Sequence, residues 1–338
     1  MAVRFHGGVG AGPRLRKIAT RDLAGLAEEM RISPARFGLL ETSPVLSCYE
    51  AGRDGFWVHR ALTTLGVTNL VVDAASIEVN RRSRRVKTDR LDVTKLVTML
   101  LRYAQGEKRV WSVLHPPSPE EEDQRHLHRE LMTLKRERTR HVNRLKGLLA
   151  SQGVVLEVHE DFLTQIETVQ DWAGQPLPPY LRQRLAREYE RWGFVQTQIR
   201  TLNRARQAAL RNAETPPMTQ IRQLLRLRGV GINSAWVYVM EFFAWRHFRN
   251  RRELAALAGL TPTPYQSRGS GREQGISKAG NRPVRAMAIE LAWAWLRFQP
   301  QSALSQWYQT RFGHGNSRIR PIGIVALARK LLIGVDPL

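Results

Sequence analysis

The spacing of apolar residues predicts a strand–helix–strand unit early in the chain. Residues 44–50, PVLSCYE, form a short apolar run that predicts a strand ending at Glu50, and residues 67–73, VTNLVVD, predict a second strand ending at Asp73. Between them, residues 55–66, GFWVHRALTTLG, have helical spacing and end on a glycine. This order predicts a right-handed crossover and a mostly parallel pair of strands.

Two long amphipathic helices are predicted in the middle of the chain, at residues 119–150 and from about 181 to 213, with the Pro-rich stretch DWAGQPLPPY between them. The first opens with proline and glutamates, which suit a helix N-terminus. Its narrow apolar stripe consists of Leu127, Leu131, Leu134, Val142, Leu145 and Leu149. Narrow seams of this kind predict an antiparallel hairpin or coiled coil, often a subunit interface. The arginine-rich polar faces also allow nucleic-acid contact.

The last part of the chain begins near AETPPM, at about residue 215, and is expected to be mainly helical. Gly229 and Gly231 lie between two predicted helices, which is the pattern of a helix-hairpin-helix turn. Its backbone amides could hold a phosphate, although Gly-x-Gly also serves simply as a tight turn. Residues 266–280 are predicted to form a glycine-rich loop between helices. The fold class is thus α/β plus all-α, divided into an α/β domain at 1–115, a helical segment at 116–215 and a C-terminal domain at 216–338.

The charge of the chain limits the classes of molecule that it is expected to bind. Lys and Arg number 53 against 30 Asp and Glu, a formal net charge of +23, which favours a polyanion such as nucleic acid. The arginines are spread along the whole chain, whereas a membrane-surface protein would concentrate them on one amphipathic helix. The single cysteine, Cys48, excludes a disulfide framework and a Cys-based zinc site within the chain. Without a signal peptide or a membrane-spanning stretch in the sequence, we expect a cytoplasmic protein.

Two aspartates open a predicted helix in RRVKTDRLDVTKLV. On a helical wheel, Asp89 and Asp92 fall on the same side as Leu96, so both acids are expected at the start of the core-facing stripe. Burying carboxylates without partners is costly, which leaves pairing with arginines, stabilisation of the helix N-terminus or a bound cation. An Asp in a first helical turn is also ordinary.

Glu50 favours the cation. It lies at the carboxyl end of a predicted strand, where open α/β sheets place their sites, although a strand-end acid can also be merely solvated. Acids from a strand end and a nearby helix can converge on Mg²⁺, and two such ions can activate the attacking and leaving oxygens in phosphodiester cleavage. Asp73 is a weaker candidate, expected to serve as a cap or turn residue.

The stretch YQSRGSGREQGISKAGNR contains serines among cations. Ser267, Ser270 and Ser277 lie in the predicted loop with Arg268, Arg272, Lys278 and Arg282. A serine in this setting could attack a phosphodiester while the cations stabilise the developing charge. Loop composition alone favours a phosphate-binding or simply flexible loop.

Several motifs together resemble one protein family. CYEAGRDGFWVHRAL, EVNRRSRRVKTDRLDVTKL, RERTRHVNRLKGLLASQGV and RELAALAGLTPTPYQSRGSGREQGISKAGNRPVRA closely resemble the DEDD-type insertion-sequence transposases, bacterial recombinases guided by a bridge RNA. The resemblance runs from about residue 20 to about residue 333. It implies an N-terminal RuvC-like (RNase H-like) domain with four metal-binding acids, a coiled-coil segment and a C-terminal transposase domain that supplies a serine nucleophile.

The resemblance also assigns roles to residues. It implies that Glu50 is the second acid of the quartet and that Asp89 and Asp92 are the third and fourth. Ser267 matches the serine that links covalently to DNA, and Ser270 is the alternative. The resemblance further implies Mg²⁺, a bridge RNA that pairs with target and donor DNA, and a dimer or tetramer that shares composite sites. The nucleic-acid contacts are expected at Arg81, Arg82, Arg84, Arg85, Lys87, Gly229, Gly231, Arg268, Arg272, Lys278 and Arg282.

The sequence departs from the family pattern at both ends. The first acid of the family lies on an opening strand, typically as Gly-x-Asp, and this chain begins too late to contain it. Asp22 is not a substitute, because RDLAGLAEEM has the pattern of a helix, and the C-terminus stops at LLIGVDPL. We therefore expect a truncated copy or a misassigned start. Two alternatives to an active recombinase follow: an inactive DNA- or RNA-binding remnant, and a Mg²⁺-dependent junction nuclease that does not use the serine.

Overall fold

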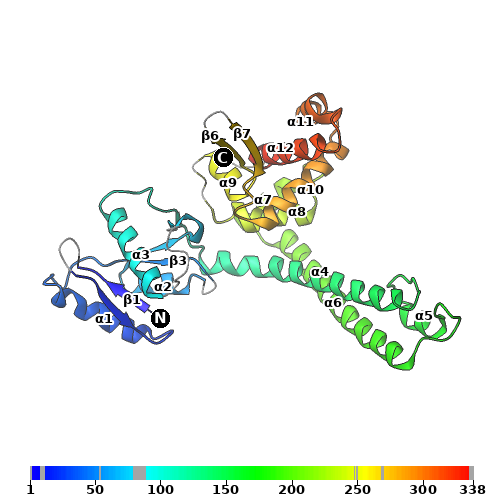
Figure 1. Ribbon diagram of the computed structural model, residues 1–338, viewed down its shortest axis with the longest axis horizontal. Helices are drawn as coiled ribbons and strands as arrows, with labels where there is room; N and C mark the ends of the chain where they lie inside the picture. Colours follow the sequence, from blue (N-terminus) through cyan, green and yellow to red (C-terminus); the bar gives the residue numbers. More distant parts are fainter. Residues whose placement is uncertain are drawn as a thin grey trace. The chain divides into compact units, whose positions relative to one another are not determined.

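The computed structural model describes two compact units, Met1–Ser118 and Pro119–Leu338 (Figure 1). It describes residues 2–7, 12–52, 55–78, 89–246, 248, 250–267 and 270–334, without the side chains of 2, 75, 89, 264–267 and 270–274. The mixed α/β fold class predicted from the sequence is confirmed. The three-part division at 115 and 215, like the RuvC-like identity of the first part, stays a prediction.

The first unit is a small α/β assembly. Its described elements are β1 (Ala2–Phe5), β2 (Arg14–Lys17), α1 (Leu23–Arg36), β3 (Leu46–Glu50), α2 (Trp57–Thr64), β4 (Thr68–Val72), η1 (Ala74–Ser76), α3 (Asp89–Ala104) and β5 (Val113–Leu114). Strands β3 and β4 are parallel and in register from Leu46↔Thr68 to Glu50↔Val72, and α2 connects them. The predicted strand–helix–strand unit is therefore confirmed. Strand β5 pairs antiparallel with β4.

Two features of the first unit concern its beginning. Strands β1 and β2 form an antiparallel hairpin that the apolar pattern did not predict. The side chain of Asp22 accepts a hydrogen bond from the Gly25 amide at 2.8 Å and so caps α1. This capping role agrees with the helical interpretation of RDLAGLAEEM. Helix α3 packs against β1 and β3 and buries Met99 beside Val72 and Trp111.

The described part of the second unit is mainly helical, with the β6–β7 hairpin and one isolated β-bridge, Gln170↔Pro176. Its described elements are α4 (Pro119–Ala150), α5 (Phe162–Thr168), α6 (Pro179–Asn212), α7 (Pro216–Leu225), α8 (Ile232–Tyr238), the π-helical turn η2 (Val239–Phe243), α9 (Arg251–Leu257), β6 (Pro262–Ser267), β7 (Ser270–Ile276), α10 (Arg282–Phe298), α11 (Ala303–Tyr308), η3 (Gln309–Gly313) and α12 (Ile319–Gly334). No helix among the described residues is both long and apolar enough to span a bilayer.

Helices α4 and α6 form an antiparallel hairpin with α5 at its far end (Figure 1). Leu131 clusters with Val195 and Ile199. Farther along α4, Leu145 clusters with Leu185, so the order of contacts is reversed along α6. The predicted antiparallel pair is confirmed, and coiled-coil geometry stays a prediction.

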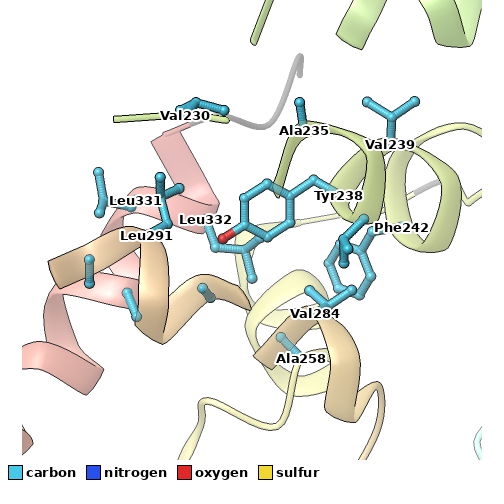
Figure 2. Close-up of a cluster of buried hydrophobic side chains, with 14 of the residues drawn as sticks. Val230, Ala235, Tyr238, Val239, Phe242, Ala258, Val284, Leu291, Leu331 and Leu332 are labelled. Carbon is cyan, nitrogen blue, oxygen red and sulfur yellow. The ribbon is translucent and has the colours of Figure 1, made fainter. Parts of the chain in front are cut away.

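The main core of the second unit brings together residues from 218 to 332. Figure 2 shows the Tyr238 ring directed toward Leu332 and Leu291, and the Phe242 ring beside Val284 on α10. These side chains are almost fully buried. Their burial fixes α8, α10 and α12 relative to one another, and thereby the turn that precedes α8.

The glycine-rich loop predicted at 266–280 is largely a β-hairpin. Strands β6 and β7 pair antiparallel, and Ser267 lies opposite Ser270. The prediction was wrong because Pro, Gly and Ser at positions 262–276 obscure the alternation of apolar and polar residues that marks a strand. Among the described residues from 266 to 281, those outside the two strands are residues 277–281.

Candidate functional site

Glu50 lies at the carboxyl edge of the β3–β4 pair. It is the last residue of β3, it is exposed, and its backbone lies opposite Val72. Asp73 follows β4 at the same edge, where its carbonyl accepts the Ser76 amide at 2.9 Å and the Ser76 hydroxyl at 2.7 Å. Asp73 thus begins the turn η1, as expected of a turn residue. The structure supports the predicted strand-end position of Glu50.

The exposure of Asp92 contradicts the expectation that the two acids at the start of α3 lie on its core-facing side. Helix α3 lies on β3 closely enough for the Cys48 sulfur to approach the Leu96 carbonyl oxygen at 3.8 Å. One turn before Leu96, Asp92 continues the line of the apolar stripe, yet its side chain is exposed. The first α3 residue in the hydrophobic cluster around Val72 is Leu96, so Asp92 lies outside that cluster. Asp89 begins α3, and its side chain lies outside the described residues.

Both described carboxylates are available to a ligand. Neither Glu50 nor Asp92 has a hydrogen bond or an ion pair with another described residue. Oxygen donors of this kind suit Mg²⁺. No group of three His, Cys, Asp or Glu side chains in the described part of the chain could by itself hold a metal ion. Cys48 adds no ligand, because burial raises the pKa of its thiol to about 12.

Several of the predicted nucleic-acid contacts are not among the described residues. Arg81, Arg82, Arg84, Arg85, Lys87 and Arg268 lie outside the described residues, as do the side chains of Ser267, Ser270 and Arg272. Lys278 and Arg282 are described, and both are exposed.

The loop after the serine hairpin is anchored to α9. The Ser277 amide donates to the Thr261 carbonyl at 2.9 Å, and the Asn281 amide donates to the Leu257 carbonyl at 2.7 Å. A Cβ atom on Gly280 would lie 2.0 Å from that Leu257 oxygen. The loop therefore needs glycine at 280, and its close packing fixes the chain between the hairpin and α10.

The Gly229–Gly231 turn joins α7 to α8, as the sequence predicted. Gly229 has a φ of +91°, and a Cβ there would contact the Ala294 carbonyl of α10 at 3.4 Å. The Gly231 amide donates to the Ser234 hydroxyl at 3.1 Å, and the Val230 amide donates to the Leu227 carbonyl at 3.0 Å. Two amides of the turn are therefore already used within the protein, which makes side-chain cations beside it more important for binding an anion.

A cavity of about 990 Å³ adjoins this turn and is lined by α4, α6, α8 and α10. It contains residues that the sequence did not single out: His128, Lys135, Arg136 and Arg206. Arg206 is 1% exposed, lies over the Trp236 ring at 4.6 Å, and donates to the Asn233 side-chain oxygen at 2.9 Å. The arginine-rich helix faces were the only signal in the sequence for these residues.

Charges near the cavity affect each other's pKa values. Burial lowers the pKa of Arg206 to about 10. Burial also lowers the pKa of Lys135, and the charges of Arg206 and Arg138 lower it further. Burial lowers the pKa of His128 to about 4, so this imidazole is neutral at pH 7.

Comparisons with known proteins point in one direction. Residues 221–309 match the model of the transposase IS116/IS110/IS902 family. A putative transposase, y4rJ, from Sinorhizobium fredii (strain NBRC 101917 / NGR234) is 43% identical over 345 residues, covering 96% of this chain and 86% of that protein. The transposase for insertion sequence element IS1328 from Yersinia enterocolitica is 27% identical over 223 residues, 64% of each chain. A probable family 20 transposase from Pseudomonas aeruginosa is 30% identical over 215 residues, 62% of this chain and 61% of that protein.

Proposed function

Because the chain belongs to the IS116/IS110/IS902 family of transposases, we propose that it cuts and rejoins the DNA of an insertion sequence through a covalent bond between Ser267 and DNA. The observation that carries this proposal is the antiparallel pairing of β6 with β7, in which Ser267 ends β6, together with the hydrogen bonds that join Ser277 to Thr261 and Asn281 to Leu257. A nucleophile needs this kind of fixed backbone to meet a phosphodiester in line.

The proposed chemistry exchanges one phosphodiester for another. The Ser267 oxygen loses its proton and attacks phosphorus, the bond from phosphorus to a sugar oxygen breaks, and that sugar oxygen takes up a proton. A sugar hydroxyl from another strand then loses its proton and attacks the same phosphorus, the bond from phosphorus to the Ser267 oxygen breaks, and the serine oxygen takes up a proton. Arg268, Arg272, Lys278 and Arg282 supply positive charge for the pentavalent state.

Magnesium is proposed as the cofactor of the first unit. Glu50 and Asp92 offer exposed carboxylates without partners among the described residues, and Asp89 lies one turn from Asp92 on the same helix. These three acids would hold the ion, whose chemistry is to stabilise charge on phosphodiester oxygens. In this proposal the acids bind and orient the ion, and the serine makes the covalent bond.

The partners proposed for the chain are DNA, a guide RNA and further copies of itself. A net charge of +23 supports binding of polyanions. The α4–α6 hairpin supplies the long helical surface that we propose as the contact in a dimer or tetramer. Base pairing by the guide RNA would then carry the choice of DNA sequence.

Formation of a covalent adduct tests the proposal. The purified chain is incubated with labelled DNA from the end of the element, its guide RNA and Mg²⁺, and adducts are resolved on a denaturing gel. We expect adducts that disappear in Ser267→Ala and persist in Ser270→Ala. The backbone sets the two serines opposite each other, which makes Ser270→Ala the closest control.

Other outcomes of this assay would replace the proposal. Mg²⁺-dependent cuts without adducts would indicate a junction nuclease, and binding without cutting would indicate a non-catalytic remnant. Adducts that vanish only in Ser270→Ala would identify Ser270, on the opposite strand of the hairpin, as the nucleophile.

A further inference from the structure

The cavity beside the Gly229–Gly231 turn is large enough for a ligand. Its volume of about 990 Å³ lies at the upper end of the range for small-molecule sites. Most of its lining comes from α4 and α10, whose positions are fixed by the buried Leu131 and Leu291. The site is therefore built by rigid elements of a single unit.

The charge in this cavity is unbalanced. Four cations line it, Lys135, Arg136, Arg206 and Arg282, against one carboxylate, Glu290. None of the four cations forms an ion pair in the described part of the chain. Arg206 instead donates to the neutral Asn233 side chain and to the Ile232 carbonyl. Burial lowers the pKa of Lys135, and the charges of Arg206 and Arg138 lower it further, so a bound anion would relieve a repulsion that is already present.

Two buried polar atoms at the cavity have no partner. His128 is 2% exposed and Arg206 is 1% exposed, and the His128 Nε2 and Arg206 Nε atoms lack hydrogen bonds among the described residues. Buried nitrogens of this kind are normally satisfied. A ligand with its own donors or acceptors would satisfy the neutral imidazole of His128, which can serve in either role.

The lining also has an apolar part, to which Met132, Met287, Leu131 and Ile232 contribute. Inorganic phosphate would leave this surface without a partner, and a duplex is too wide to enter. One unstacked nucleotide presents both a flat apolar base with polar edges and an anionic phosphate.

We propose that this cavity receives a single nucleotide turned out of a DNA or RNA strand, with its phosphate on Lys135 and Arg136 and its base against Met132 and Met287. The proposal rests on the nucleic-acid binding proposed above and assigns a ligand to the surface beside the Gly229–Gly231 turn. It places an unpaired nucleotide in the second unit, apart from the serine hairpin.

Binding of bulged duplexes by the full chain tests the proposal. Fluorescence anisotropy compares a duplex, the same duplex with one bulged 2-aminopurine nucleotide, and the same duplex with an abasic bulge, in DNA and RNA versions. We expect the bulged nucleotide to bind at least about ten-fold more tightly than the plain duplex, which corresponds to about 1.4 kcal/mol. The abasic bulge should lose most of this gain, and the DNA and RNA arms show which strand supplies the nucleotide.

Matched variants locate the effect. Ala286 is exposed and lines the cavity, so Ala286→Trp should fill it without disturbing the core and abolish the preference for the bulge. Ala150→Trp, at the exposed end of α4 away from the cavity, should keep the preference. Lys135→Gln should weaken binding of the bulge and lower the salt slope by about one, whereas Arg140→Gln on the same helix should leave the preference unchanged.

The result that overturns the inference is equal affinity for bulged and plain duplexes, or a preference that survives in Ala286→Trp. The adduct assay run in parallel separates this failure from failure of the proposed function. Adducts without a bulge preference would refute only the nucleotide binding proposed for the cavity. A bulge preference without adducts would support nucleotide binding in the cavity and refute the serine chemistry.

Discussion

Replacing Gly280 by alanine should destabilise the second unit through a backbone collision. Gly280 has a φ of +80°, and an added Cβ would lie 2.0 Å from the Leu257 carbonyl oxygen, about 1 Å closer than real Cβ contacts allow. The same oxygen accepts the Asn281 amide at 2.7 Å. A shift that relieves the collision must therefore break this hydrogen bond as well.

The expected cost is the sum of two effects. A non-glycine residue in the left-handed region costs about 1 kcal/mol, and loss of the half-buried backbone hydrogen bond costs about 1–2 kcal/mol. Together they give about 2–3 kcal/mol. For a unit of this size, each kcal/mol lowers the melting temperature by about 2–4 °C, so Gly280→Ala should lower it by roughly 4–12 °C.

Thermal unfolding of the full chain, followed by tryptophan fluorescence, measures this effect. Gly275→Ala is the matched control, because Gly275 has a φ of +82° and nothing within 4 Å of its added Cβ. The control should show the left-handed strain alone, about 1 kcal/mol. Equal shifts for the two variants would refute the collision with Leu257 and leave backbone strain as the whole effect.

Three further predictions concern stability and binding. Burial alone would raise the pKa of Glu188, but hydrogen bonds from His141 and Arg191 and the charge of Arg144 hold it below its usual value. Its contribution to stability is therefore present above the unfolded carboxyl pKa of about 4.3 and is lost as pH falls through the lower folded pKa. Acid titration of stability should show a shallower loss below about pH 4 in Glu188→Gln, and an equally steep loss would contradict this. Leu145→Ala, which removes a fully buried side chain, should cost about 3–5 kcal/mol in urea unfolding. Leu91→Ala, at a side chain 51% exposed, should cost under about 0.5 kcal/mol. Nucleic-acid affinity should fall steeply with added salt because bound Lys and Arg release counterions, and salt-independent binding would count against phosphate contacts.

Secondary structure was predictable where the apolar pattern was regular. The crossover unit β3–α2–β4 and helix α4 fall within two residues of their predicted ends, because strand runs and helical spacing directly reflect burial. The β1–β2 hairpin and the β6–β7 hairpin were missed. Both are short and rich in Arg, Gly or Pro, and their stability depends on contacts with other segments, which spacing alone does not reveal.

Some features of the candidate sites could be predicted from the sequence and others could not. The strand-end position of Glu50 follows from topology, and the exposure of Asp92 could not be predicted because the helical wheel does not show where packing along a helix begins. The cavity brings together His128, Lys135, Arg206 and Arg282, which are up to 154 positions apart in the sequence. His128, Lys135 and Arg206 are ordinary polar residues of long helices, and Arg282 was predicted only as part of another segment. The tertiary packing is therefore what identifies the group.

The α4–α6 hairpin also has a consequence for the order of folding. Both helices and their connection lie within residues 119–212, and the clusters that join the two helices contain no residue beyond 202. The main core of the second unit, in contrast, requires residues from 218 to 332. Leu127, Ala209 and Leu210 at the base of the hairpin pack against that core. During synthesis the hairpin can therefore form first, and its apolar residues stay exposed until the core of the second unit folds against them.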